Sequence, residues 1–194
     1  MSRKINVFII VKAHFSSLKE VGKKNLCFVD MLTFILLPAL VSLLGLFIRF
    51  NLSKDLDSLL VNFGAIFTAL LLSVIVLIYD QENRLIEKSI QFKNELGQVY
   101  AAKMILLKEL YHNISYAILC SLLLVLLAFI HNALPVNIKF TEIMIPKVNF
   151  ILGLSVATSI VTPLIVFLAL NIFLTILMIV KRLYLILISN NPGS

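Results

Sequence analysis

The stretch LLVNFGAIFTALLLSVIVLIY, residues 59–79, contains no charged side chain and is long enough to cross a bilayer as a helix. A second uncharged stretch covers residues 114–130. Residues 80–113 lie between them, are rich in Lys, Arg, Glu and Gln, and keep a helical period. We therefore expect two membrane helices, at about 56–79 and 114–130, that continue into water and meet in a helical hairpin near Gly97.

The composition supports the same class. The chain has 194 residues, of which 60% are hydrophobic and 14% charged, whereas a soluble domain is about 45–50% apolar and about 25% charged. The apolar residues are concentrated in long blocks, which is typical of a polytopic membrane protein. The length fits one domain and leaves no segment for a separate soluble catalytic domain.

Two further apolar blocks complete a four-span prediction. Residues 26–50 form the first, with Pro38 near the middle, where a proline removes a backbone donor and kinks a helix. Residues 148–180 form the last and contain no charge. As a helix this block would extend about 50 Å, beyond the ~30 Å hydrocarbon core, so it must tilt, break at Pro163 or project inward. We expect residues 189–194 to form a flexible tail. The predicted fold class is an all-α membrane protein with four transmembrane helices and helical extensions on the cytoplasmic side.

Residues 1–25 are basic, with six Lys or Arg residues against the single acid Glu20. Their apolar residues recur at helical spacing, at Phe8, Val11, Phe15, Leu18 and Val21. We expect a basic amphipathic helix that lies on the inner membrane surface. The alternative is a helix packed against the cytoplasmic part of the protein without contact with lipid.

The distribution of basic residues predicts the orientation. Thirteen of the 17 Lys and Arg residues lie in residues 1–25, in residues 80–113 or at the C-terminal end. Cytoplasmic segments carry such an excess. We expect a multi-pass protein of the bacterial inner membrane with both termini and the hairpin in the cytoplasm. The net charge of +7 is explained by this orientation and does not require double-stranded nucleic acid as a partner.

One face of the second span carries small and polar residues at spacings of three and four. A helix brings such positions to one side. These residues, which we call the α-helical stripe, are Asn62, Ala65, Ala69, Ser73, Val76 and Asp80. Two interpretations remain open: close helix–helix packing through small residues, or the lining of a pore in a symmetric oligomer.

The hairpin carries basic and aromatic residues that suit an anionic ligand. Guanidinium groups form paired hydrogen bonds with phosphate, and an aromatic ring stacks on a base. The candidate ligand-binding residues are Arg84, Lys88, Lys93, Tyr100 and Lys103. The alternative is an ordinary solvated charged surface.

Motifs of enzyme chemistry are not found in the sequence. It contains no Gly-rich phosphate loop, zinc-binding pattern or nucleophile elbow. The three histidines, including His131 in the predicted outer loop, lie in different segments. Cys27 and Cys120 fit no metal motif. We expect no catalytic site, metal or cofactor, and interpret His131 as a lone residue at the membrane interface.

A membrane channel built as a ring-shaped homo-oligomer, such as a tetramer, fits these features best, because four spans make a poor pore alone. The second span or the fourth span would lie at the axis of the ring and line the ion path. Apolar side chains there would close it by excluding water. A ligand at the hairpin would shift the balance between closed and open states.

The segment VLIYDQENRLIEKSIQFKNELGQVYAAKMILLKELYHN, residues 76–113, continues an apolar span into a charged helix. In a small four-span chain this layout resembles the membrane effectors of bacterial anti-phage defence, and over residues 26–188 it is similar to the transmembrane effector of Hailong systems. The resemblance implies a tetrameric ion channel gated by an oligonucleotide from a partner nucleotidyltransferase. Opening would collapse the membrane potential of the infected cell.

Two other functions remain as alternatives. One is a non-conducting membrane scaffold or accessory subunit whose hairpin binds another protein. The other is a pore-forming toxin that opens by accumulation and needs no ligand. Flux in reconstituted vesicles and its dependence on a ligand distinguish the three functions.

Overall fold

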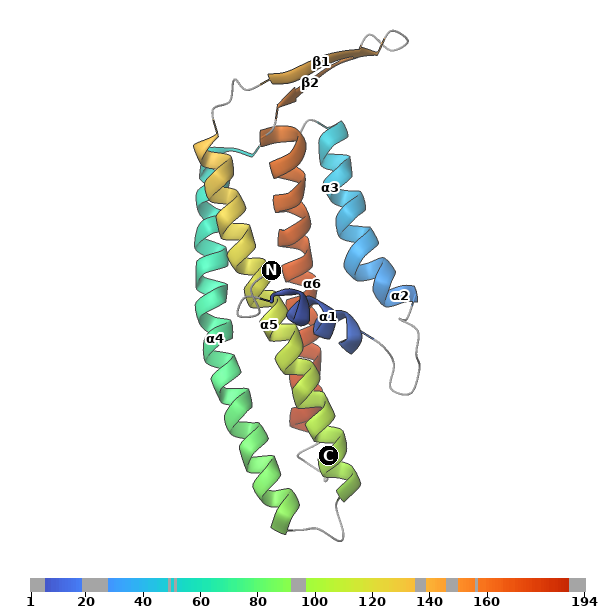
Figure 1. Cartoon of the computed structure of the whole chain (residues 1–194), viewed down its shortest axis with the longest axis vertical. Coiled ribbons are helices and arrows are strands. Elements are labelled where there is room, and N and C mark those ends of the chain that lie inside the picture. The colour runs from blue at the N-terminus through green and yellow to red at the C-terminus, as the bar shows by residue number, and fades with distance from the viewer. Residues whose placement is uncertain are drawn as a thin grey trace. The chain divides into compact units, whose positions relative to one another are not determined.

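The structure, a computed structural model, describes residues 6–18, 28–48, 50, 52–91, 97–134, 139–145, 150–155 and 157–188. These residues are almost entirely helical, as predicted. Three helices account for most of them, α4 (Lys54–Gln91), α5 (Gly97–Ala133) and α6 (Thr162–Ile188) (Figure 1). Each contains a segment long and apolar enough to cross a membrane, which indicates a membrane-embedded protein.

The first predicted span is a shorter helical segment. It consists of α2 (Phe28–Met31), a π-helical turn at Leu32–Leu36 and α3 (Leu37–Phe47). Its apolar part, Leu32–Phe47, would extend about 24 Å as a helix, less than the ~30 Å hydrocarbon core. Among the described helices, three therefore meet the length of a full span and this one falls short.

The last predicted span begins later than expected. Residues 150–155 form strand β2, which pairs antiparallel with β1 (Lys139–Ile145). The prediction of helix from 148 was therefore wrong over β2, as was that of a plain loop over β1. A short apolar run is compatible with either a strand or a helix, so the sequence alone did not distinguish them.

Pro163 lies in the first turn of α6. The helix begins at Thr162, directly after a π-helical turn at Ala157–Val161. Proline suits the first turn of a helix because it has no N–H and that N–H would have no intrahelical partner. The helical path continues through Pro163, so the expected break at this proline is not found. The block changes from strand to helix before it, since β2 ends at Ser155 and the π-helical turn starts at Ala157.

The chain divides into two compact units, through which the three long helices run. Unit 1 contains residues 1–31, 68–119 and 173–194, and unit 2 contains residues 32–67 and 120–172. The core of unit 1 is an apolar cluster of Leu71, Ile78, Leu107, Leu110, Ile114, Ala117 and Ile179. Buried aliphatic residues of unit 2 include Leu124, Ile165 and Ile172.

The buried positions of α4 are seven residues apart. They are Asp57 and Gly64 in unit 2, and Leu71 and Ile78 in unit 1. A seven-residue repeat places them along one narrow edge of the helix. The rest of the α4 surface is largely exposed. Only 17% of the most apolar stretch of α4 is buried, compared with 50% for α5.

Local interactions explain where α4 starts. The Ser53 hydroxyl accepts a hydrogen bond from the Leu56 backbone N–H at 3.2 Å, which makes Ser53 the N-cap of a helix that begins at Lys54. Asp55 and Asp57 lie in the first turn, where the helix dipole stabilises negative charge.

In unit 2, a side chain of another helix donates a hydrogen bond to the backbone carbonyl of Phe34, which Pro38 cannot bond. Residue 38 would donate to the carbonyl of Phe34 in a regular helix, but proline has no N–H. The Asn171 side-chain amide of α6 donates to the Phe34 carbonyl oxygen at 2.8 Å, and Asn171 is 2% exposed. The π-helical turn Leu32–Leu36 lies immediately before this proline.

We predict that Gly64→Ala destabilises the contact between α4 and α5 in unit 2. A Cβ atom at Gly64 would lie 2.6 Å from Val125 Cγ2 and 3.1 Å from the Ser121 carbonyl oxygen. Overpacking outweighs the gain in helix propensity, so the unfolding free energy should fall by roughly 1–2 kcal/mol. Thermal unfolding in detergent, followed by circular dichroism, measures the change.

Gly45→Ala is the matched control. A Cβ at Gly45 meets only Phe50 Cβ, at 3.9 Å, so the same substitution in another helix should leave the melting temperature unchanged or raise it. Equal losses for the two variants would show that the tight contact at Gly64 is not the cause.

We predict that Asn171→Ala lowers the unfolding free energy by about 1–2 kcal/mol, because the Phe34 carbonyl loses this donor. In a Pro38→Ala background the loss should be smaller, since the substituted residue provides a backbone N–H for that carbonyl. A double-mutant cycle of thermal stabilities measures this coupling. Additive effects would contradict the assigned role of Asn171.

Candidate functional site

All six residues of the α-helical stripe are exposed in the structure, namely Asn62, Ala65, Ala69, Ser73, Val76 and Asp80. At 100° per residue, they lie about 100–160° around α4 from the buried edge at Gly64, Leu71 and Ile78. Packing among the described residues therefore leaves the stripe uncovered. Its role as a pore lining stays a prediction.

The candidate ligand-binding residues are only partly described. Arg84 is exposed on α4, and Lys103 is half-buried on α5. Lys93 lies outside the described residues, as do the side chains of Lys88 and Tyr100, although their backbones belong to α4 and α5. Only Arg84 and Lys103 can therefore be placed, and a cradle for an anion stays a prediction.

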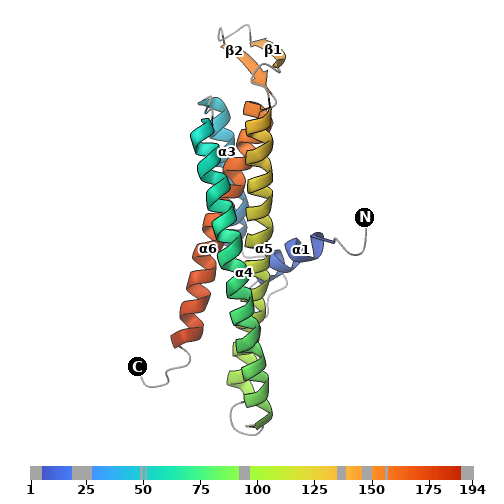
Figure 2. The ribbon, with the colours of Figure 1, turned by 90° about the vertical axis from the view of Figure 1, so that its left-hand side faces the viewer.

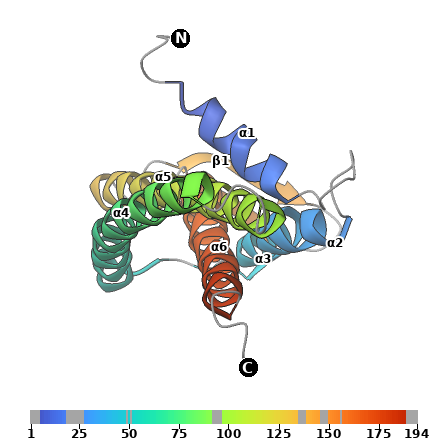
Figure 3. The same cartoon turned by 90° about the horizontal axis from the view of Figure 1, so that it is seen from below.

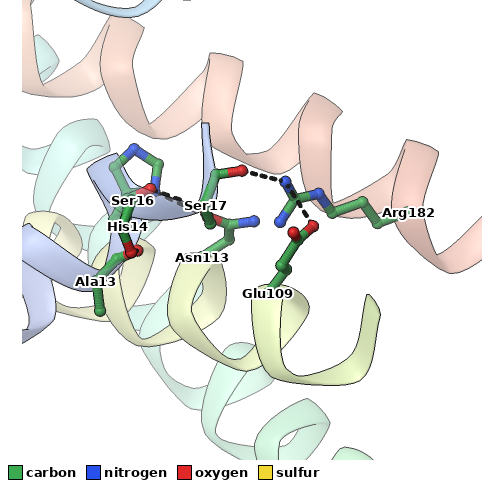
Figure 4. Close-up of polar contacts among 7 residues, drawn as sticks. All are labelled: Ala13, His14, Ser16, Ser17, Glu109, Asn113 and Arg182. Atoms are coloured by element: carbon green, nitrogen blue, oxygen red, sulfur yellow. Dashed lines mark hydrogen bonds and ion pairs between the residues drawn. The ribbon is translucent and has the colours of Figure 1, made fainter. Parts of the chain in front are cut away.

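Unit 1 contains a buried polar cluster that joins α1 (Phe8–Ser17) to α5 and α6 (Figure 4). We call it the α1 anchor, and its members are His14, Ser17, Glu109, Asn113 and Arg182. The residues come from three segments that are far apart in the sequence. His14 and Asn113 are both 0% exposed.

His14 is held in the α1 anchor by an amide and a ring. Its Nδ1 lies 2.9 Å from Asn113 Oδ1, and its imidazole stacks on Tyr116 with ring centroids 3.9 Å apart and planes within 5°. Burial disfavours the charged imidazolium and lowers the pKa of His14 to about 4, although the Asn113 bond acts in the opposite direction. His14 is therefore neutral at physiological pH.

Arg182 binds the C-terminal end of α1. Its Nη2 donates to the Ser17 backbone carbonyl at 2.9 Å and pairs with Glu109 Oε2 at 3.2 Å. The last carbonyls of a helix have no intrahelical donor, and a cation there also complements the helix dipole. One guanidinium thus caps α1 and connects it to α5 and α6.

The Asn113 amide can adopt either orientation in the α1 anchor. The Ser17 hydroxyl lies 2.7 Å from the His14 carbonyl and 2.8 Å from Asn113 Oδ1, but its one hydrogen serves one acceptor at a time. Asn113 Nδ2 and Arg182 Nη1 are buried donors with no partner among the described residues, and the amide nitrogen points toward Arg182 in Figure 4. Turning the amide over would give Arg182 an acceptor and Ser17 a donor. Both orientations keep His14 neutral.

Unit 2 contains a second buried polar cluster, where ends of α4, α5 and α6 meet. Asp57 Oδ2 lies 2.7 Å from His131 Nδ1, and His131 Nε2 lies 3.3 Å from Thr162 Oγ1. Asp57, His131 and Thr162 are 2%, 9% and 3% exposed. The interpretation of His131 as a lone residue was therefore wrong, because residues 74 positions apart meet only in the folded chain. Its place at the membrane interface stays a prediction.

This second cluster has the order of groups found in hydrolase triads. A nucleophile must reach its substrate, however, and the Thr162 hydroxyl is buried at the first residue of α6. The arrangement instead ties the first turn of α4 to the last turn of α5. Removing one partner of such a buried pair would leave an uncompensated polar or charged group, which costs about 3–5 kcal/mol.

The sequence offered little signal for either buried cluster. Asn113, Asn171 and Thr175 are polar residues at buried positions of α5 and α6, and polar residues within apolar helices are the one pattern that marks such contacts. The predicted apolar edge of α1 is only partly buried. Leu18 is buried as expected, together with His14 and Ser17, whereas Phe8 is exposed and Val11 and Phe15 are half-buried.

Comparison with known proteins gives no relative. No protein-family model, curated protein or solved structure matches the chain.

We predict that acid weakens the docking of α1. Free α1 takes up a proton on His14 below pH 6.5, whereas docked α1 does so only near the pKa of about 4. Docking is therefore constant above pH 6.5 and loses up to about 3 kcal/mol between pH 6.5 and 4. Hydrogen exchange of residues 8–17 in detergent across this pH range measures the loss.

His14→Asn is the control for this titration. Asparagine retains a polar group near the position of Nδ1 but does not titrate. Hydrogen exchange of residues 8–17 in this variant should show weaker docking of α1 at all pH values and no acid-dependent step. An unchanged step in His14→Asn would assign the pH dependence to another group.

Proposed function

We propose that the chain assembles into a ring-shaped homo-oligomer in the bacterial inner membrane and acts as an ion channel gated from the cytoplasm. Four spans per subunit, with residues 26–50 as the first, and both termini in the cytoplasm belong to this proposal. The ligand is an anionic oligonucleotide, as the similarity to Hailong effectors implies, and the channel serves in anti-phage defence.

The observation that carries the proposal is the exposed α-helical stripe on a helix of membrane-spanning length. Asn62 lies within the apolar segment of α4, and its amide is exposed rather than packed against this chain. Polar groups at membrane depth face a protein interior or water, because lipid offers no hydrogen bonds. A second subunit or an aqueous path at the stripe provides the missing polar surroundings.

The stripe is well suited to a narrow, closable path. Its residues are small apart from Asn62, Val76 and Asp80, and the Ser73 hydroxyl already bonds to the Ala69 carbonyl at 3.2 Å. Val76 is 59% exposed and, repeated around a ring, would form an apolar constriction that excludes water when closed. Asp80 would place a ring of carboxylates beyond it and favour cations.

The predicted ligand acts on the continuation of the same helix. Arg84 lies one turn beyond Asp80 on the exposed side of α4. Because α4 continues without interruption from Lys54 to Gln91, an anion bound at Arg84 would act directly on the helix that lines the path.

We predict that a cysteine at Ala69 makes the flux sensitive to a charged thiol reagent. Cys27 and Cys120 are first replaced by alanine, the protein is reconstituted in liposomes, and oligonucleotide-dependent ion flux is measured. Modification of Ala69→Cys should abolish flux. Leu70→Cys is the matched control, since Leu70 is also exposed but lies 100° further around α4, where it should face lipid.

The same assay distinguishes the alternatives. Ligand-dependent flux that is lost in Arg84→Glu with Lys88→Glu, and retained in Lys54→Glu at the other end of α4, supports the gated channel. Flux without any ligand would support the toxin. No flux under any ligand or voltage, with a stably bound second protein, would support the scaffold and overturn the channel.

A further inference from the structure

The first helix has two opposite faces, and only one is used inside unit 1. His14, Ser17 and Leu18 are buried against the rest of the unit, whereas Phe8, Ile9, Lys12 and Ser16 are exposed. At 100° per residue, the exposed set lies on the side of the helix opposite the buried set. Phe8 and Ile9 are 68% and 64% exposed.

The level at which α1 is attached is fixed by two other helices. On α5, His14 contacts Asn113 and Tyr116, which flank the start of the uncharged stretch at Ile114. On α6, the Ser17 carbonyl binds Arg182, just past the last uncharged residue, Val180. At this level α5 passes from apolar to charged composition, and α6 carries its two charged residues, Lys181 and Arg182. Such a level is where a bilayer surface would lie.

The direction of α1 also suits a bilayer surface. Figures 2 and 3 show α1 running across α5 rather than along it. Because α5 and α6 have the length and composition of membrane spans, a helix that crosses α5 lies roughly in the plane of the membrane. Its exposed face then points away from the bundle, toward the surrounding lipid.

We propose that the exposed face of α1 is a lipid-binding surface that takes anionic phospholipid. Phe8 and Ile9 insert at the boundary between headgroups and acyl chains, and Lys12, which lies between them on the same face, binds a headgroup phosphate. Interfacial helices combine these residue types, and basic side chains attract anionic lipids. The six Lys and Arg residues of residues 1–25 provide the charge complementarity.

A spin label at position 9 tests this proposal in the full chain. Ile9→Cys is prepared with Cys27 and Cys120 replaced by alanine, and the protein is placed in nanodiscs of phosphatidylcholine with or without phosphatidylglycerol. Collisions with oxygen, which concentrates in lipid, and with a water-soluble nickel chelate give the depth of the label. A label at Arg84→Cys, on the exposed charged part of α4, is the control for an aqueous position.

The proposal expects the label at position 9 to be accessible to oxygen and protected from nickel, with the protection increased by phosphatidylglycerol. Lys12→Gln should remove the increase and leave the basal protection. Nickel accessibility equal to that at position 84 in both lipids would overturn the proposal. Protection from both reagents would also overturn it, because it would show that protein covers this face.

The outcome does not depend on the proposed channel. The label reports the position of α1 whether or not the protein conducts ions, so a nickel-protected label in a non-conducting protein would retain the lipid surface and remove the channel. Unfolding of the labelled variant is recognised separately, since it would alter its melting temperature relative to the unlabelled chain.

Discussion

Helix α4 packs against its own chain along a single narrow edge, and much of the architecture follows from this constraint. Asp57, Gly64, Leu71 and Ile78 recur every seven residues, so the buried edge keeps one direction along the helix. Within unit 2, α4 and α5 approach closely at Gly64, where the Val125 side chain and the Ser121 carbonyl leave no room for a side chain. A helix held along one edge leaves most of its surface to lipid, water or another subunit.

The buried polar groups show how the chain satisfies backbone and side-chain hydrogen bonds in an apolar interior. Asn171 donates a hydrogen bond to the Phe34 carbonyl, which Pro38 cannot bond because it has no N–H. Arg182 donates to a carbonyl at the end of α1, and His131 bonds to Asp57 at the start of α4. Each of these side chains lies on a helix other than the one that it contacts. Unpaired polar groups cost several kcal/mol in hydrocarbon, so such contacts fix the neighbours of each helix more specifically than aliphatic packing does.

Local signals in the sequence predicted the elements that local physics decides. The uncharged stretches at residues 59–79 and 114–130 predicted the apolar parts of α4 and α5. The apolar run at residues 150–155 was read as helix because hydrophobicity alone does not distinguish a strand from a buried helix. The pairs His14–Asn113 and Asp57–His131 join residues 99 and 74 positions apart, and a single sequence carries no signal of that kind.

Residues at the charged ends of α5 and α6 have consequences for a gated channel. Arg182 contacts both α1 and Glu109, so α1 cannot leave its position without exposing a largely buried guanidinium and a helix-end carbonyl. If the outer face of α1 binds lipid, the bilayer surface and the Arg182 end of α6 become mechanically connected through the α1 anchor. A ligand at the extension of α4 would then move that helix, whereas α5 and α6 would be held at the membrane surface. Such a movement would rearrange the contacts at the exposed α-helical stripe of α4.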